Sequence, residues 1–188
     1  MIKPLPILLC LLLKTTALGA DPAITHAVER SILLIEKSVA TYVKARDCFT
    51  CHHQALPIMT LSQARRSGFS VAQKTFTTQT RFTLEYFSDR QDRLPKGEGV
   101  PGGPYTAGYA LAQLQATQEP ANPTSKALIN YLLKTQKPDG SWRIRTHRPP
   151  LEDSHFTATA LSIKAMINSE PAKKAAQWIA LAQPKTTE

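Results

Sequence analysis

The sequence predicts an all-α protein built from helix pairs, and three observations carry this prediction. Apolar residues recur at every third or fourth position through much of the chain, and no segment alternates like a half-buried strand. Residues that cap helix N-termini precede these segments at spaced points. They are Asp21, Ser70, Asn122 and Ser169. Three of the four are followed closely by proline, which favours the first turn of a helix.

The first three helices are expected over 21–44, 54–66 and 70–89. Gly68 suits the left-handed exit that closes many helices, so the second helix should end there. Ser70, with Gln73 three residues later, should cap the third. The expected apolar face of the first helix consists of Ile24, Val28, Ile32, Ile35, Val39 and Tyr42, and that of the third consists of Val71, Thr75, Phe82 and Tyr86.

The second half of the chain begins with a loop over 94–104 that is rich in Gly and Pro. Four further helices are expected, over 105–117, 123–135, 154–168 and 171–182. A shift of 50 residues places Ala110-Leu111 over Ala160-Leu161 and Ala107-Gly108 over Thr157-Ala158. This repeat indicates a helix-pair unit with small residues at a close packing point, and it favours a solenoid or a closed ring.

The two ends of the chain are assigned separately from the folded domain. Residues 1–20 resemble a secretory signal, with Lys3, an apolar stretch over 7–13 and small residues up to Ala20. The mature chain is therefore expected to begin near Asp21 and to be periplasmic or secreted. The alternative is an uncleaved anchor, although the apolar stretch is shorter than the roughly 20 residues of a spanning helix.

After the signal, the sequence predicts one domain over 21–183, no transmembrane segment and a polar tail over 184–188. Lys and Arg number 23 against 14 Asp and Glu, which gives a formal net charge of +9. The basic residues are dispersed through the sequence, whereas nucleic-acid-binding proteins gather them on one face. Nucleic acid is therefore not an expected partner, and attraction to acidic partners remains open.

The segment over 126–142 resembles the Gln-Trp repeat motif of squalene cyclases and related prenyltransferases. The resemblance rests on the spacing of Tyr131, Gln136, Gly140 and Trp142. It implies an α/α toroid in which Gln136 contacts backbone at a helix end and Trp142 packs beyond the Pro-Asp-Gly turn. The chain has fewer helix pairs than the full ring of that family, so we expect a partial toroid. Its open flank would be covered by a partner or by self-association.

The catalytic groups of that family are not recognisable in this chain. The Asp-x-Asp-Asp acid of squalene cyclases is missing, and the nearest acidic pair, Glu152-Asp153, fits a helix N-terminus. No prenyltransferase zinc site is recognisable, so the fold resemblance does not by itself imply prenyl chemistry, and whether the protein is an enzyme stays open. A non-catalytic binding or assembly module is one reading, in which Tyr105, Tyr109 and Phe156 would line a concave apolar surface for an isoprenoid-like ligand or a partner chain.

The sharpest chemical signal is Cys48-Phe49-Thr50-Cys51-His52, which matches the c-type haem attachment pattern. Cys48 and Cys51 are spaced to form thioethers to the two vinyl groups, and His52 would bring an imidazole to the iron. The predicted function is therefore electron transfer by an exported protein with one haem c and a redox partner protein.

Two alternatives for the same motif remain open, as does the opposite axial ligand. Cys48 and Cys51 fit a disulfide in an oxidising compartment, or a zinc site completed by His52 or His53. If haem is bound, His53 cannot supply the opposite ligand, because neighbouring helical residues point about 100° apart. The candidates are His155, His147 and Met166. Without a sixth ligand, the iron would be open to a small molecule.

Overall fold

The computed structural model describes residues 21–144, 146 and 154–183, and in this part the chain is all-α, as predicted. The segment 1–20, His147, the pair Glu152-Asp153 and the tail over 184–188 lie outside the described residues. The described helices are α1 (Pro22–Ala45), α2 (Leu56–Arg66), α3 (Gln73–Ser88), α4 (Pro104–Ala116), α5 (Pro123–Thr135), α6 (His155–Ala165) and α7 (Glu170–Leu181). A π-helical turn, η1 (Cys51–Ala55), precedes α2, and a short 3-10 turn, η2 (Leu94–Lys96), follows α3.

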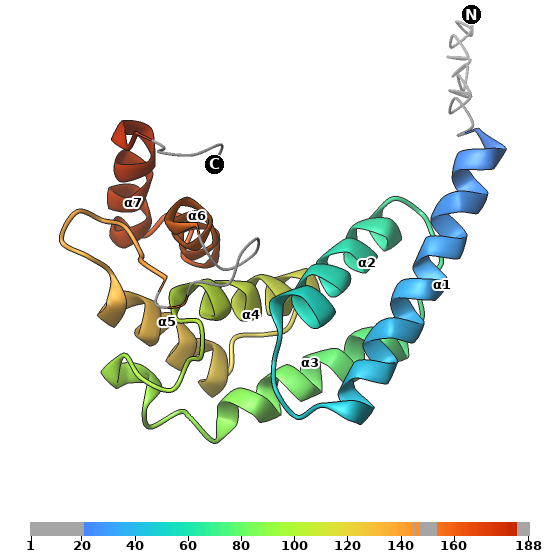
Figure 1. Cartoon of the computed structure of the whole chain (residues 1–188), viewed down its shortest axis with the longest axis horizontal. Helices are drawn as coiled ribbons and strands as arrows, with labels where there is room; N and C mark the ends of the chain where they lie inside the picture. The colour runs from blue at the N-terminus through green and yellow to red at the C-terminus, as the bar shows by residue number, and fades with distance from the viewer. Residues whose placement is uncertain (1–20, 145, 147–153, 184–188) are drawn as a thin grey trace, which may run out of the picture.

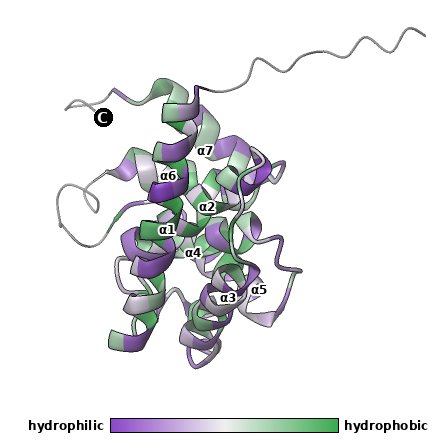
Figure 2. Ribbon diagram, turned by 90° about the vertical axis from the view of Figure 1, so that its right-hand side faces the viewer, coloured by the Kyte–Doolittle hydropathy of each residue, from purple (hydrophilic) through white to green (hydrophobic). Residues whose placement is uncertain are grey.

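Helix α4 lies at the centre of the molecule, with α1, α2 and α3 on one side and α5, α6 and α7 on the other (Figure 1). Every residue from Pro104 to Leu114 is buried. A helix that is buried on all its faces carries few charges, and α4 carries none. Figure 2 shows the apolar residues gathered around α4, while the outer helices turn polar residues to the surface.

Helix α4 packs closely on α6, and these two helices carry the residues that a shift of 50 positions superposes. A Cβ added at Gly108 would lie 2.7 Å from the Cβ of Leu161 and 3.4 Å from its backbone carbonyl carbon. Ala158 of α6 is also fully buried. These small residues therefore lie where α4 and α6 pack closely on each other.

Gly108→Ala should lower the free energy of unfolding by about 1–2 kcal/mol, although Ala favours helices by about 1 kcal/mol over Gly. The added methyl group meets Leu161 inside a packed core. Chemical denaturation measures the change. The double variant Gly108→Ala/Leu161→Gly should lose less stability than the sum of the losses of the two single variants, because Leu161→Gly removes the Cβ that the added methyl group meets. A stabilised Gly108→Ala protein would show that α4 and α6 are not in close contact.

Three of the four predicted caps are confirmed, and one is wrong. Asp21 accepts from the backbone N–H of Ala23, Asn122 and Ser125 form a reciprocal capping box, and Ser169 accepts from the N–H of Ala172. Ser70 is not a cap.

Helix α3 begins later, at Gln73, and its cap comes from another helix. The carboxylate of Glu36 in α1 accepts from the N–H of Ala72 at 2.8 Å and from the hydroxyl of Thr75 at 3.1 Å. An acid 36 residues earlier in the chain therefore replaces the local serine.

The predicted apolar face of α3 is also wrong. Its buried residues are Phe76, Gln79, Thr80, Thr83 and Phe87, whereas Val71, Thr75, Phe82 and Tyr86 are only partly buried. The buried face is mostly polar because its side chains are hydrogen-bonded across the interior. The amide of Gln113 in α4, for example, donates to the hydroxyl of Thr83 at 2.7 Å.

Gln136 and Trp142 connect α5 to α6 and α7. The amide of Gln136 donates to the carbonyl oxygens of Gly140 at 2.9 Å and Pro171 at 2.8 Å. Trp142 is fully buried, and its indole N–H donates to the carbonyl oxygen of Leu132 at 2.7 Å. Gln136 thus contacts backbone at a helix end and Trp142 packs beyond the turn, which are the two contacts expected from the sequence.

Candidate functional site

The Cys48–His52 segment lies in the connection between α1 and α2. The backbone leaves α1 through an extended Arg46 and re-enters a helix at Cys51 through a wide π-helical turn. Pro57 explains the wide turn, because proline has no N–H and its ring clashes with the carbonyl four residues earlier. The N–H of Leu56 accordingly donates to the carbonyl of Cys51. Such π-helical turns are frequent at functional sites.

A fully buried glutamine, Gln54, holds this turn in place. Its carbonyl oxygen accepts from the N–H of Thr50 at 3.0 Å, and its amide donates to the side-chain oxygen of Gln79 at 3.1 Å. The amide of Gln79 in turn donates to the carbonyl of Val39 in α1 at 2.9 Å. The motif is therefore tied through buried amides to both α1 and α3. Sequence reasoning missed this role, since glutamine is usually a surface residue.

Cys48 lies at the surface, next to the end of α1. The hydroxyl of Tyr42 donates to the carbonyl of Cys48 at 3.1 Å and lies 3.2 Å from its sulfur. Burial, followed by the hydrogen bond to Cys48, raises the pKa of Tyr42 above its ordinary value. The Tyr42 ring also stacks on His53, with ring centres 5.1 Å apart and planes 13° from parallel. Cys48 is therefore exposed but held against α1.

The raised pKa of Tyr42 predicts a measurable response to Cys48→Ala. Removing the thiol should lower the pKa of Tyr42, although burial, the larger cause, should keep it above about 10. The pKa of Tyr42 is measured from phenolate absorbance during a pH titration of the wild-type and Cys48→Ala proteins. Adding Tyr42→Phe to each protein shows which part of the absorbance change belongs to Tyr42. Because the folded-state pKa is raised, the neutral phenol stabilises the fold below about pH 10 and this stabilisation is lost as pH rises through the folded-state pKa. An unchanged titration in Cys48→Ala would contradict the contact.

Cys51 and His52 face different surroundings although they are adjacent. Cys51 is only 4% exposed and packs beside Phe49 in the main core cluster. His52 is exposed, and its Nδ1 lies 3.2 Å from the hydroxyl of Thr50 and 3.7 Å from the sulfur of Cys51. If Nδ1 carries the proton and donates to Thr50, the lone pair of the ring lies on Nε2. The motif thus presents one surface thiol, one core thiol and one surface imidazole.

The structure bears on the two alternative interpretations of the cysteines. No disulfide joins Cys48 to Cys51. Within the described part of the chain, no group of three or more His, Cys, Asp or Glu side chains is arranged to hold a metal ion.

The candidates for an opposite axial ligand are widely separated. His155 begins α6, where its Nδ1 accepts from the N–H of Ile144 at 3.4 Å. Met166 follows the last residue of α6 and belongs to the same core cluster as Cys51. The 11-residue helix α6 is about 16 Å long, so His155 and Met166 lie at its opposite ends. His147 lies outside the described residues.

The expected concave apolar surface is not built from the tyrosines assigned to it. Tyr105 and Tyr109 are 2% and 8% exposed and pack edge to face inside the core. Phe156 packs against Trp178, with ring centres 5.0 Å apart. These rings occupy positions in the central helix or against α7, where they stabilise the fold.

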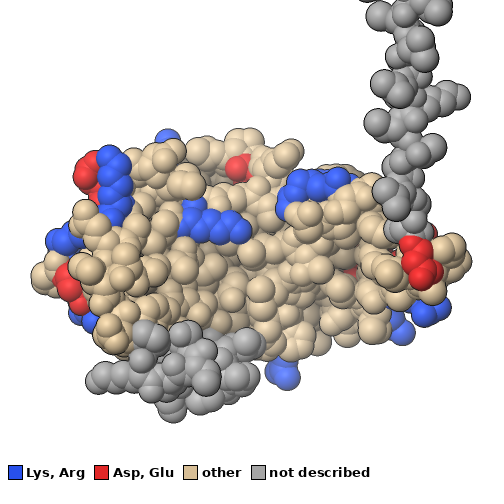
Figure 3. All heavy atoms as spheres, turned by 90° about the horizontal axis from the view of Figure 1, so that it is seen from above, with Lys and Arg blue, Asp and Glu red and all other residues tan. Residues whose placement is uncertain are grey.

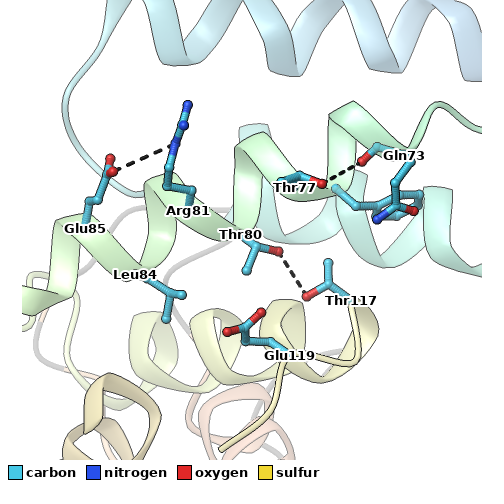
Figure 4. Close-up of a pocket in the computed structure, with 9 residues that line it drawn as sticks. Gln73, Thr77, Thr80, Arg81, Leu84, Glu85, Thr117 and Glu119 are labelled. Carbon is cyan, nitrogen blue, oxygen red and sulfur yellow. Dashed lines mark hydrogen bonds and ion pairs between the residues drawn. The ribbon is translucent and has the colours of Figure 1, made fainter. Parts of the chain in front are cut away.

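Two surface grooves are large enough to hold a small ligand. One, of about 410 Å³, lies along α1 next to the motif and is lined by His53 and Tyr42 among others. The other, of about 320 Å³, lies between α3 and the α4–α5 connection (Figure 4). There Thr80 donates to Thr117 at 3.1 Å, and Arg81 lies 3.8 Å from Glu85. Neither groove contains a residue of the motif, but the α1 groove includes His53, which follows the motif, and Tyr42, whose hydroxyl lies 3.2 Å from the Cys48 sulfur. The candidate site is therefore the motif together with the α1 groove.

The face of the molecule seen from above does not present one continuous charged patch. Figure 3 shows the basic side chains as separate groups over a largely uncharged surface. Within the described residues, no helix combines the length and the apolar character that crossing a membrane requires.

Comparison with family models, with curated proteins and with solved structures finds no match to this chain. The candidate site therefore rests on the geometry of Cys48, Cys51 and His52 and on the groove beside them.

Proposed function

We propose that this protein carries one covalently attached c-type haem and transfers electrons. The observation that carries the proposal is the Cys48-x-x-Cys51-His52 motif, held in a single turn that enters α2. When bound, the haem would supply one-electron chemistry at its iron. The exported location inferred from residues 1–20 supports the proposal, because disulfide and thioether chemistry both suit compartments outside the cytoplasm.

The residues present fit such a group in two respects, and the attachment chemistry needs no further reagent. Cys48 is exposed and available at the end of α1. His52 is exposed, and a hydrogen bond from Nδ1 to Thr50 would direct Nε2 to the iron, as second-shell partners of metal-binding histidines do. Each thiol would add across a vinyl group, with sulfur bonding to one carbon and the thiol proton passing to the next, so no oxidant is required.

The burial of Cys51 adds a condition to this proposal. At 4% exposure, its sulfur cannot reach a vinyl group from solution while the turn is packed on the core. We infer that the bond at Cys51 forms before the motif packs against Phe49 and α4. Tight folding of the apo chain would then slow attachment.

We further propose that the helix pairs form a partial α/α toroid with an open flank. The packing of α4 on α6 at Gly108 and the bonds from Gln136 support the repeat. Large apolar side chains are exposed near both ends of the described chain and suit contact with a redox partner or a second copy. They are Ile24, Leu33 and Leu34 in the first helix and Ile167 and Leu181 around the last.

The experiment is expression in a host with haem-attachment machinery, followed by pyridine haemochrome absorption after acid-acetone extraction. The expected result is one covalent haem per chain, lost in the Cys48→Ser/Cys51→Ser double variant. His52→Ala should keep the attached mass but change the spectrum of the iron. Colourless protein would overturn the proposal, and a mass lower by about two hydrogens would instead favour the Cys48–Cys51 disulfide of a binding module.

A further inference from the structure

A third groove lies between α1 and α3, which pack against each other (Figure 1). We call it the α1–α3 groove, and it has a volume of about 330 Å³. Its lining residues are Val39, Ala40, Val43 and Lys44 from α1, and Ala72, Lys74, Thr75, Thr78 and Gln79 from the start of α3. None of them belongs to the Cys48–His52 motif or lines the α1 groove beside it. The α1–α3 groove is therefore separate from the candidate haem site.

The inner side of the α1–α3 groove offers little to a polar ligand. Val39 and Gln79 are buried there, and Thr75 is partly exposed. The Gln79 side chain accepts from the amide of Gln54 at 3.1 Å and donates to the carbonyl of Val39 at 2.9 Å. The hydroxyl of Thr75 donates to Glu36 at 3.1 Å. Because these polar groups are already hydrogen-bonded, polar groups of a ligand that faced them would lose water without gaining a partner, whereas an alkyl chain has no such groups.

The two charged residues that line the groove are both lysines, but their surroundings differ. The carboxylate of Glu36 accepts hydrogen bonds from the N–H of Ala72 and the hydroxyl of Thr75, which flank Lys74 in the sequence. An anion at that end of the groove would therefore meet a carboxylate of the protein. Lys44 lies eight residues further along α1 than Glu36, which is about 12 Å along the helix axis. A ligand with one negative charge would accordingly place it at Lys44.

We propose that the α1–α3 groove binds a single-chain alkyl carboxylate. The carboxylate pairs with the ammonium group of Lys44, and the alkyl chain lies over Val39 and Val43 and points toward Ala72. The match is one of charge and polarity, because the groove combines an inner side without available hydrogen-bonding groups, a cation at one end, and the Glu36 carboxylate at the other. The proposal does not depend on haem, since it uses no residue of the motif.

Decanoate and decyltrimethylammonium test the proposal, because they share one alkyl chain and carry opposite charges. The full chain is titrated calorimetrically with each, at concentrations below those at which they form micelles. Decanoate should bind at least about tenfold more tightly, a difference of about 1.4 kcal/mol. Lys44→Gln should remove most of this preference, and Lys44→Glu should reverse it. Lys37→Gln, which changes a lysine of the same helix that lines the other groove, should leave the preference unchanged.

Each outcome bears on one part of the proposal. Equal binding of the two ligands, or a preference that survives Lys44→Gln, would overturn it. An equal loss in Lys37→Gln would also overturn it, because the net charge of +9 would then explain the preference. Lys74→Gln should reduce the preference less than Lys44→Gln, and the opposite order would contradict the direction of the ligand. Val43→Thr keeps the shape of the side chain but adds a hydroxyl, so it should weaken both ligands together; unchanged affinities would contradict contact with the alkyl chain.

Discussion

Cys48 should react with a thiol reagent such as iodoacetamide at least about 100-fold faster than Cys51 in the folded protein. Cys48 is exposed, whereas Cys51 is 4% exposed and packs in the main core cluster. Reaction at Cys51 requires the η1 turn to leave that cluster. A local opening that costs roughly 3 kcal/mol reduces the reactive fraction about 100-fold.

Single-cysteine variants measure the two rates separately, with Cys10→Ser in both backgrounds so that one thiol remains. Denaturant should bring the two rates close together, which controls for intrinsic reactivity. Gln54→Leu should accelerate the reaction of Cys51 in particular. It removes the hydrogen bond that Gln54 accepts from Thr50, and it leaves the side-chain oxygen of Gln79 without the donor that Gln54 supplies. Gln63→Leu, an exposed glutamine of the same helical segment, should change neither rate. Similar native rates for Cys48 and Cys51 would show that the turn does not pack as described.

This difference in reactivity matters for how the proposed haem is attached. If Cys51 is protected in the folded apo chain, attachment machinery must act on an unpacked motif. Gln54→Leu would then raise the yield of covalent haem while lowering stability. The reaction rate of Cys51 therefore tests whether the buried amides around Gln54 control the attachment of haem.

The helices themselves could be predicted because their signals are local. Three of the four proposed caps lie within three residues of the groups that they bind, and the spacing in α1 follows one helix. The apolar face of α3 and its cap could not be predicted. Between Phe76 and Phe87 the buried face consists of Thr and Gln side chains, and Gln79 and Thr83 have hydrogen-bond partners in α1 and α4. The cap is Glu36, from another helix. Hydrogen bonds to distant segments make these residues suitable for the interior.

The candidate site divides in the same way. The spacing of Cys48, Cys51 and His52 is local, so the sequence placed the motif in the turn between the first two helices. The burial of Cys51 depends on α4 packing against η1, more than 50 residues away, and no local pattern indicates it. The groove beside Tyr42 likewise arises only when His53 returns to stack on α1. The sequence predicted the chemistry of the motif. It did not predict which of Cys48, Cys51 and His52 are exposed.

Trp142→Ala should lower the free energy of unfolding by about 3–5 kcal/mol, which is a large share of the 5–15 kcal/mol typical of a domain. Trp142 is completely buried, and its indole N–H donates to the carbonyl of Leu132 at 2.7 Å. Its backbone N–H also donates to the hydroxyl of Thr159 in α6 at 3.0 Å. The side chain therefore fills the space where the end of α5 meets α6, and its removal leaves a large cavity.

Two further variants show whether this loss comes from the cavity or from the hydrogen bond. Trp142→Phe keeps a six-membered ring, so it leaves a smaller cavity than Trp142→Ala, but it removes the indole donor to the carbonyl of Leu132; a loss of about 2–3 kcal/mol, below that of Trp142→Ala, is expected. Trp178→Ala, which removes a partly buried indole between Phe156 and Arg143, should cost less than Trp142→Ala. Thermal and chemical denaturation, followed by circular dichroism, measure all three. If Trp178→Ala proved the more damaging change, the C-terminal helix pair would depend on α7 packing more than on the α5–α6 connection.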